Sequence, residues 1–438
     1  MRDRSSFLSA SSTVKRIAVA CVAIAGWALS EAAAAASDVT IRALTRDGSW
    51  TRAELVSIAD GTWRFIRPSS KDEQMIREDD VVAFIVERSR GASDAASDSE
   101  VPTPLSYGLA EFSNGQRLPG NFRVMRDANL WDHRWIGSIP LDLEQIATLR
   151  LQGARTPDRR AEGDTLLLVN GDVLTGFIEK MGEDFVFEPL AQQDGAADAK
   201  PAQRTISMER IAAIALARAD APRGEAMRIW SIDGSLVEAR ALAFDEKRGW
   251  GFELVDPLFA KIRAARTTES VPPAANPIAG LLQPGRLVPL ATAGKPTIAV
   301  PAEHYHFGLE RAVRIGASDR ALLGLAPIEL AGPIVARFPR PALLESAEGT
   351  AMFTCELVLA EPAPRDARVD IEVRVGDSPV TRISLDPSTR RAPLVVPNVA
   401  LGRNGTSGQV EITMTDGGNG IAGDSVILER ACFILSAR

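Results

Sequence analysis

A short sequence frame occurs twice in this chain and limits what its N-terminal half can fold into. Residues 114–120 (NGQRLPG) and 170–176 (NGDVLTG) share the pattern NGxxLxG, and each follows a short strand-like run. Asn-Gly accepts the positive φ angles that a tight two-residue turn requires, and the second Gly suits a bulge or bend in the returning strand. The frame therefore predicts two equivalent β-hairpins.

A second shared frame follows each predicted hairpin, LEQIATL at 143–149 and MERIAAI at 208–214. One helical turn that leads into a strand fits this pattern. Fainter copies of the repeat begin at Asp47-Gly48 and at Asp233-Gly234, the latter without a clear second frame. The repeat predicts β modules at residues 38–88, 105–153 and 164–217, and a partial module at 225–262.

The order of strand, Asn-Gly turn, bent strand, helical turn and closing strand resembles Sm-like or SH3-like barrels. Six of the seven tryptophans belong to these modules: Trp50, Trp63, Trp131, Trp135, Trp230 and Trp250. Exposed rings would be stacking platforms for sugars or grips for peptides. We favour rings buried in the cores of small barrels, because Trp is usually largely buried.

Composition changes after the repeats. A Pro/Ala-rich stretch predicts a linker at residues 263–286, and strict alternation of apolar and polar residues then appears at 369–375 and 410–414. Residues 353–359 form a third such face, and 426–435 is typical of a closing strand. These patterns predict half-buried strands of antiparallel sheets in a domain at residues 287–438. The expected fold class is mainly β throughout.

Three segments of this domain resemble the NPCBM family of carbohydrate-binding modules. They are LGLAPIEL at 323–330, the strand 369–375 running into Gly376-Asp377, and VEITMTDGGNGIAGD at 410–424. The resemblance implies a galactose-binding-like jelly roll, a β-sandwich that this family appends to glycoside hydrolases and large exported bacterial proteins. The chain departs from the family in its first segment, with Pro327-Ile328 where a His is usual. After the final Asp424 it has Ser425 rather than Trp.

The loop from Asp416 to Asp424 is the predicted site. Asp416, Asn419 and Asp424 are polar groups that could meet the hydroxyls of a glycan, and their oxygens could also ligate calcium. Structural calcium is what the family resemblance implies. A tight strand connection that uses Asp and Asn for left-handed geometry explains the same residues.

Two cysteines, Cys355 and Cys432, lie in strand-like runs near the start and end of the predicted jelly roll. In an oxidising compartment they could form a disulfide, because first and last strands of jelly rolls often neighbour each other. The alternative is a pair of buried free thiols.

The N-terminus has the pattern of a secretory signal peptide over residues 1–36: basic residues, an apolar run at 17–29, and Ala34-Ala35-Ala36 before Ser37. Its removal leaves 46 basic and 55 acidic side chains, a formal charge of −9, which argues against nucleic-acid binding. We expect an exported protein, periplasmic, cell-surface or extracellular, with no transmembrane segment after cleavage.

Few residues suggest catalysis. Beyond the signal peptide the histidines are His133, His304 and His306. The last two, with Glu303, could begin a metal site but lack a third ligand at a telling spacing. We therefore expect a non-catalytic protein that binds a glycan or cell-envelope polysaccharide. The alternatives are an envelope scaffold that binds envelope proteins and, third, an exported glycoside hydrolase or its accessory.

Overall fold

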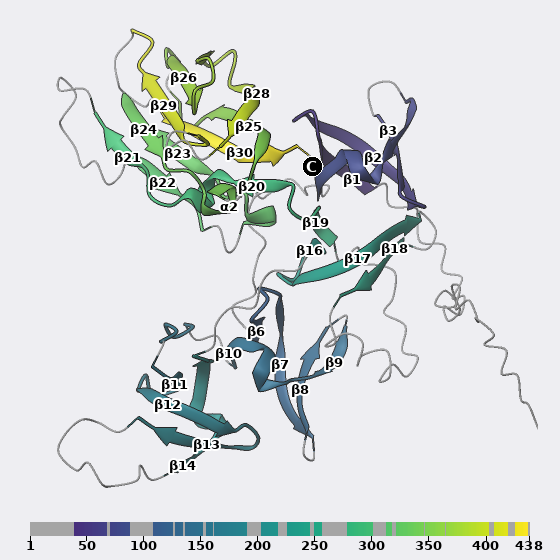
Figure 1. The fold of residues 1–438 in the computed structure, drawn as a ribbon, viewed down its shortest axis with the longest axis vertical. Helices are drawn as coiled ribbons and strands as arrows, with labels where there is room; N and C mark the ends of the chain where they lie inside the picture. The colour runs from purple at the N-terminus through teal and green to yellow at the C-terminus, as the bar shows by residue number, and fades with distance from the viewer. Residues whose placement is uncertain are drawn as a thin grey trace, which may run out of the picture.

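The computed structural model of the chain (Figure 1) shows a mainly β protein, which confirms the expected fold class. The structure describes residues 39–67, 71–87, 108–125, 128–134, 136–151, 155–160, 162–190, 203–217, 226–245, 249–255, 278–300, 312–317, 321–345, 347–363, 365–402, 407–418 and 425–436. The predicted signal peptide lies outside these ranges. Four small β modules come first, and a β-sandwich follows them.

The modules repeat one strand order: an antiparallel meander whose last strand returns to pair with the first. Module 1 contains β1 (Val39–Thr45), β2 (Trp50–Ala59), β3 (Thr62–Ile66), β4 (Glu73–Arg77) and β5 (Val81–Val86). Module 2 contains β6 (Gly108–Phe112), β7 (Arg117–Met125), β8 (Ala128–His133), β9 (Gly137–Pro140) and β10 (Ile146–Arg150). Module 3 contains β11 (Asp164–Leu168), β12 (Val173–Lys180), β13 (Asp184–Pro189), β14 (Arg204–Ser207) and β15 (Ile211–Ala215).

Module 4 contains β16 (Met227–Ser231), β17 (Leu236–Asp245), β18 (Gly249–Leu254) and β19 (Ile278–Leu282). β19 lies inside the predicted linker at 263–286 and pairs with β16, as the fifth strand pairs with the first in the other modules. The linker prediction is wrong for residues 278–282. Their apolar run, IAGLL, directly follows a Pro/Ala-rich segment whose composition dominated the prediction.

Short 3₁₀ helices precede the fifth strands of the first three modules: η1 (Glu78–Asp80), η2 (Leu143–Gln145) and η3 (Met208–Arg210). The last two coincide with the second shared sequence frame, so the predicted helical turn leading into a strand is present in both copies. In η2 the side chain of Asp142 caps the helix by accepting a hydrogen bond from the Glu144 backbone N–H at 2.9 Å.

The turn between the first and second strands is built alike in all four modules. Its glycine has a φ between 81° and 90°: Gly48, Gly115, Gly171 and Gly234. The side chain of the preceding Asp or Asn accepts a hydrogen bond from the backbone N–H two residues further on. This side-chain bond favours the turn, so Asp-Gly serves as well as Asn-Gly here. The two NGxxLxG frames thus occupy equivalent turns.

The second glycine of each frame lies against an aromatic ring of the third strand. A Cβ atom on Gly120 would lie 2.5 Å from Nε1 of Trp131 and 2.5 Å from the carbonyl oxygen of Asp132. Gly176 faces Phe187 in the same way, at 2.6 Å from the ring. Both rings are fully buried. The frame therefore needs glycine because the ring that fills the core leaves no room for a side chain.

The tryptophans follow the expected burial in part. Trp63 and Trp131 are buried in the main core of the modules, and Trp250 is half-buried against it. Trp230 is buried and Trp50 half-buried in a second apolar cluster, which also contains residues of the sandwich. Trp63 packs edge-on against Phe84, with ring centroids 5.2 Å apart. Trp135 lies outside the described residues.

The last strand of each module joins the modules in two pairs. β10 pairs antiparallel with β15, which links modules 2 and 3, and β5 pairs antiparallel with β19, which links modules 1 and 4. A bridge between Arg117 of β7 and Leu236 of β17 connects module 2 to module 4. In Figure 1 module 1 lies beside the β-sandwich, module 4 lies below module 1, and modules 2 and 3 lie lowest.

The β-sandwich has two antiparallel sheets. The six-stranded sheet contains β20 (Leu287–Pro289), β22 (Val313–Ile315), β23 (Ile328–Ala331), β25 (Gly349–Leu359), β28 (Arg391–Leu401) and β30 (Ser425–Leu435). The five-stranded sheet contains β21 (Thr297–Ala299), β24 (Ile334–Phe338), β26 (Val369–Val375), β27 (Thr381–Leu385) and β29 (Val410–Thr415). Short helices η4 (Leu290–Ala293), η7 (Leu322–Gly324) and α2 (Ala342–Glu345) lie between strands of the sandwich. The apolar residues of the alternating runs fill the space between the sheets.

The outer face of the six-stranded sheet is docked against modules 1 and 4. An apolar cluster joins the two parts and includes Leu44, Val82 and Trp230 on one side and Leu287, Leu323 and Ile434 on the other. The Thr354 hydroxyl donates a buried hydrogen bond to the Gly48 carbonyl oxygen at 3.2 Å. The Arg430 guanidinium lies 5.3 Å from the ring centroid of Trp50 and pairs with Glu356. In Figure 1, β21, β24 and β29 lie on the other side of the sandwich from β1–β3.

Candidate functional site

The turn that follows β29 contains the first predicted site residue. Oδ1 of Asp416 accepts a hydrogen bond from the Gly418 backbone N–H at 3.0 Å, and Gly417 and Gly418 have φ angles of 58° and 85°. Asp416 therefore stabilises a tight turn of two left-handed glycines, as the alternative interpretation of this loop expected. The Asp416 side chain is half-buried on this turn. Asn419 and Asp424 lie outside the described residues.

Polar side chains from β26, from β27 and from Arg368, which directly precedes β26, lie next to this turn. Arg368 packs against Gly417, where an added Cβ would meet its Cγ at 2.6 Å, and its Nε lies 4.0 Å from Oδ1 of Asp370. The Ser384 hydroxyl donates to the same Asp370 oxygen at 2.5 Å. Strand register explains the grouping, because Asp370 of β26 is opposite both Thr415 of β29 and Ser384 of β27.

Asp386 completes this group, which we call the Asp416 end and define as Arg368, Asp370, Ser384, Asp386 and Asp416. Oδ1 of Asp386 accepts hydrogen bonds from the Ser388 hydroxyl at 2.6 Å and from the backbone N–H of Thr389 at 2.7 Å. These bonds, with a smaller contribution from Arg368, lower the pKa of the Asp386 carboxyl. The group stays ionised at neutral pH and supplies a fixed acceptor.

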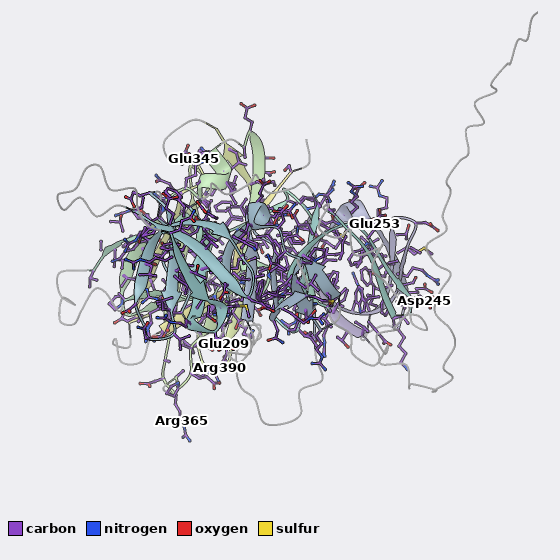
Figure 2. All side chains as sticks on the ribbon, turned by 90° about the horizontal axis from the view of Figure 1, so that it is seen from below. Glu209, Asp245, Glu253, Glu345, Arg365 and Arg390 are labelled. Carbon is purple, nitrogen blue, oxygen red and sulfur yellow. The ribbon has the colours of Figure 1, made fainter. Side chains whose placement is uncertain are left out.

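The Asp416 end and the outer face of the five-stranded sheet form a continuous polar surface. Arg382 pairs with Glu372 at 2.8 Å, and Arg337 pairs with Glu411 at 2.5 Å. At the adjoining loops, Arg390 pairs with Glu361 at 2.7 Å. Figure 2 shows Arg390 extending outward at the edge of the molecule. Because the other sheet is docked on the modules, this surface is the open one of the sandwich.

This surface offers hydrogen-bonding groups and no described aromatic platform. Carboxylates accept from the adjacent hydroxyls of a sugar, and Ser and Arg side chains donate to its oxygens. The described aromatic side chains of the sandwich, Phe338, Phe353 and Phe433, are all buried. The Asp416 end can therefore meet a polyhydroxylated ligand by hydrogen bonds but does not add ring stacking.

Two hollows lie elsewhere. One, of about 480 Å³, borders β21 and β22 and is mainly apolar, with Lys295 as its one charged lining residue. The other, of about 680 Å³, lies between modules 1 and 4 and is lined by both signs of charge, including Asp60, Glu78 and Arg240. Neither contains the predicted site residues. We place the candidate site at the Asp416 end because its acceptors and donors converge there.

The structure also brings together a Ser, a His and an Asp that sequence reasoning did not connect. Nε2 of His133, at the end of β8, lies 2.9 Å from the Ser235 hydroxyl and 3.2 Å from Oδ2 of Asp233, both in the module 4 turn. Nδ1 accepts the Ile136 backbone N–H at 3.2 Å. A catalytic triad needs the Asp on one ring nitrogen and the Ser on the other. Here Asp233 and Ser235 both contact Nε2, and Ser235 is buried. The three side chains therefore join two modules rather than form a proton relay.

The two cysteines are free and buried. They lie on neighbouring strands, where Cys432 of β30 is opposite Thr354 of β25. Cys355 therefore points to the opposite face, into the sandwich core, and Cys432 packs in the cluster that contacts the modules. The structure thus has the pair of buried thiols, and the disulfide alternative does not fit this register.

Metal and membrane features can be assessed for the described part of the chain only. Within it, no three His, Cys, Asp or Glu side chains gather in an arrangement that could hold a metal ion. Glu303, His304 and His306 lie outside the described residues. Across the same ranges, no helix has the length and apolar character needed to cross a bilayer.

Comparison with known proteins gives structural neighbours only. No protein-family model matches the chain, and no curated protein matches it in sequence. A CBM51 module of the Clostridium perfringens enzyme GH95, solved with methyl-galactose, is 15% identical and aligns over 34% of this chain and 99% of its own, with a TM-score of 0.24. The CBM51-2 and INT domains of C. perfringens ZmpB, solved with GlcNAc, are 16% identical over 34% of this chain and 31% of theirs, with the same TM-score of 0.24.

The tandem CBM51 modules of the Streptococcus pneumoniae family 98 glycoside hydrolase Sp3GH98 are 9% identical. They align over 91% of this chain and 89% of their own, with a TM-score of 0.21. Likeness of this degree does not transfer a ligand to this chain, so the candidate site depends on its own residues.

Proposed function

We propose that this protein is an exported, non-catalytic glycan-binding protein whose β-sandwich contacts the sugar at the Asp416 end. One observation carries the proposal. The sandwich buries the outer face of one sheet against modules 1 and 4 and leaves the polar face of the other sheet open, together with the carboxylates and donors of the Asp416 end. The modules then act as the support that presents this surface.

The chemistry of the site predicts weak binding. Asp416, Asp370 and Asp386 accept hydrogen bonds from sugar hydroxyls, and each such bond replaces one to water. Without an aromatic platform the stacking contribution is missing. We expect affinities in the millimolar range, about −4 kcal/mol. A surface that contacts several sugar units of one polysaccharide would bind it with higher avidity, because the contacts repeat along the polysaccharide.

The test is a glycan array probed with the full chain from Ser37 to Arg438. We expect Asp416→Ala and Asp370→Asn to weaken the response to any glycan that binds. Asp132→Asn, at a half-buried carboxylate of module 2 that pairs with Arg123, is the control and should bind like wild type. If wild type responds to no glycan, or if the Asp132→Asn control loses binding as strongly as the two site variants, the proposal is wrong.

Calcium binding by the same loop is a separate expectation. Among the described residues, Asp416 supplies a carboxylate for it. An ion there would order the loop rather than take part in chemistry. Thermal unfolding of wild type and Asp416→Ala, each with and without chelator, separates the two roles. A calcium site predicts that chelator lowers the melting temperature of wild type alone. A change in glycan binding with equal melting curves indicates direct contact with the sugar.

The envelope-scaffold function is the second candidate. It is favoured by the way in which the modules are connected, since three of the four equivalent turns contact another part of the chain. A full chain that binds no glycan but binds an envelope protein through the remaining turn, that of module 3, would support this candidate.

A further inference from the structure

The hairpin turn of module 3 differs from its three equivalents in what it touches. In module 1 the Gly48 carbonyl accepts from Thr354 of the sandwich, and in module 4 the Gly234 carbonyl accepts from Nε of Arg117 at 3.2 Å. In module 2 the turn residue Gln116 is buried and accepts the Glu238 backbone N–H at 3.0 Å. Residues 169–173 of module 3 are all exposed, and a Cβ on Gly171 would meet no atom within 4 Å.

The contact between modules 2 and 4 relates equivalent positions. Arg117 and Leu236 each begin the second strand of their module, two residues after the turn glycine, and they are opposite each other in an antiparallel bridge. The two turns therefore meet in an approximately two-fold arrangement. The contact between modules 2 and 4 therefore shows that two such modules can pack turn to turn.

Val173 holds the same position in module 3. Val173 is 50% exposed, whereas Leu236, its equivalent in module 4, packs in the apolar cluster between the modules and the sandwich. Val169, on the other side of the turn, is 55% exposed, and its equivalent Ile232 packs in that same cluster. Module 3 thus presents apolar side chains where the equivalent residues of module 4 are covered.

Two further apolar residues extend this surface. Phe177 is 48% exposed and lies on the outward side of β12 with Val173, because side chains alternate along a strand. Leu190 is 37% exposed and lies beside Thr175, whose carbonyl accepts its backbone N–H at 3.0 Å. We call Val169, Val173, Phe177 and Leu190 the module 3 patch.

We infer that two copies of this protein associate through the module 3 patch in a two-fold, turn-to-turn contact. In this arrangement Val173 lies opposite Val173 of the second copy, as Arg117 lies opposite Leu236 within one chain. An isologous contact of this kind buries the same patch on both copies and closes at a dimer. The dimer would display two sandwiches, which increases the avidity of weak binding at each.

Sedimentation velocity of the full chain from Ser37 to Arg438 tests the association. We expect wild type to form a dimer as its concentration rises to about 100 µM. Val173→Glu buries a like-charge pair at the two-fold axis and should raise the dissociation constant at least about tenfold. Met75→Glu, at a residue 72% exposed on module 1, is the matched control and should dimerise like wild type.

The geometry is tested by Val173→Cys under mild oxidation. A two-fold contact brings identical residues together, so this variant should form a disulfide-linked dimer, whereas Met75→Cys should not. The natural thiols Cys355 and Cys432 are buried and do not interfere. A wild-type chain that is monomeric over the whole range overturns the inference. So does a dimer that Val173→Glu leaves intact or that Val173→Cys does not cross-link. Binding of a different protein by a monomeric chain would assign the patch to that partner instead.

Discussion

Nε2 of His133 lies 3.2 Å from a carboxylate oxygen of Asp233 and thereby connects the third strand of module 2 to the hairpin turn of module 4. Burial alone would raise the pKa of the Asp233 carboxyl. Hydrogen bonds from His133 and Ser235 outweigh burial and hold this pKa far below its usual range. The same carboxylate also accepts the Ser235 backbone N–H at 2.9 Å, so one side chain both shapes a turn and joins two modules.

We predict that Asp233→Asn lowers the free energy of unfolding by about 2 to 3 kcal/mol, since it leaves a buried His without its charged partner. Asp47→Asn is the matched control, because Asp47 shapes the equivalent turn through Thr45 and Ser49 without a His. Modules 2 and 3 already carry Asn at this position. Chemical denaturation at pH 7 should show a much smaller loss for the control. Equal losses for both variants would mean that the turn, and not His133, accounts for the effect.

The same pair predicts a pH dependence. The pKa of Asp233 is depressed in the folded state, so its stabilisation is present above the unfolded pKa of about 3.9 and is lost as pH falls through the folded value. The stability difference between wild type and Asp233→Asn should therefore be largest near neutral pH and shrink below about pH 4. Denaturation curves of both proteins between pH 7 and pH 3 check this. A difference that grows on acidification would contradict the assignment.

Two glycines at equivalent turns separate backbone strain from packing. Gly171→Ala adds a side chain in open space at a φ of 90°, which costs about 1 kcal/mol. Gly48→Ala has the same strain at a φ of 81° and also places its Cβ against Met352 of the docked sandwich. We expect a further loss of about 1 to 2 kcal/mol, measured as the difference between the two variants in thermal unfolding. Equal losses would show that Met352 moves away from the added Cβ without a cost in stability.

The thiols should be inert in the folded protein. Burial raises the pKa of the Cys432 thiol to about 12, against the lowering effect of Arg430, and burial also raises that of Cys355. A thiol reagent at pH 8 should label neither residue until denaturant is added, because the thiolate is the reactive form. Reducing agent should leave the melting temperature unchanged. A lower melting temperature on reduction would indicate that the two cysteines form a disulfide.

Gly120→Ala tests the requirement for the second glycine of the frame. Its Cβ would press on Trp131 and on the carbonyl oxygen of Asp132, and a strand backbone cannot move as a side chain can. We expect a loss of about 3 kcal/mol or a failure to fold. Modules 1 and 4 carry the buried residues Ala53 and Ala239 at this position, so Ala239→Gly is the reciprocal control and should cost only about 1 kcal/mol. Tolerance of Gly120→Ala would show that the ring is not fixed.

Local features were predictable from the sequence, and long-range ones were not. The Asn-Gly turns, the helical turn before the fifth strand and the alternating strands of the sandwich each depend on residues close together in the chain. β19 was missed because its partners, β16 and β5, are distant in sequence and its own run is short. His133 and Asp233 could be brought together only by the packing of two modules. The Asp416 turn was predicted from its own residues. Asp370 and Ser384 lie beside it only because of the register of β26 with β27 and β29.

The pairing of β5 with β19 imposes an order on folding. β5 ends at Val86 and β19 begins at Ile278, so module 1 is complete in sequence long before the strand that covers its edge has been synthesised. Until then the edge of β5 is open to other strands, and open edges promote aggregation. Modules 2 and 3 pair with each other through neighbouring parts of the chain and can close first. A ribosome-bound chain that stops before Ile278 should therefore contain a paired central unit and an unprotected first module.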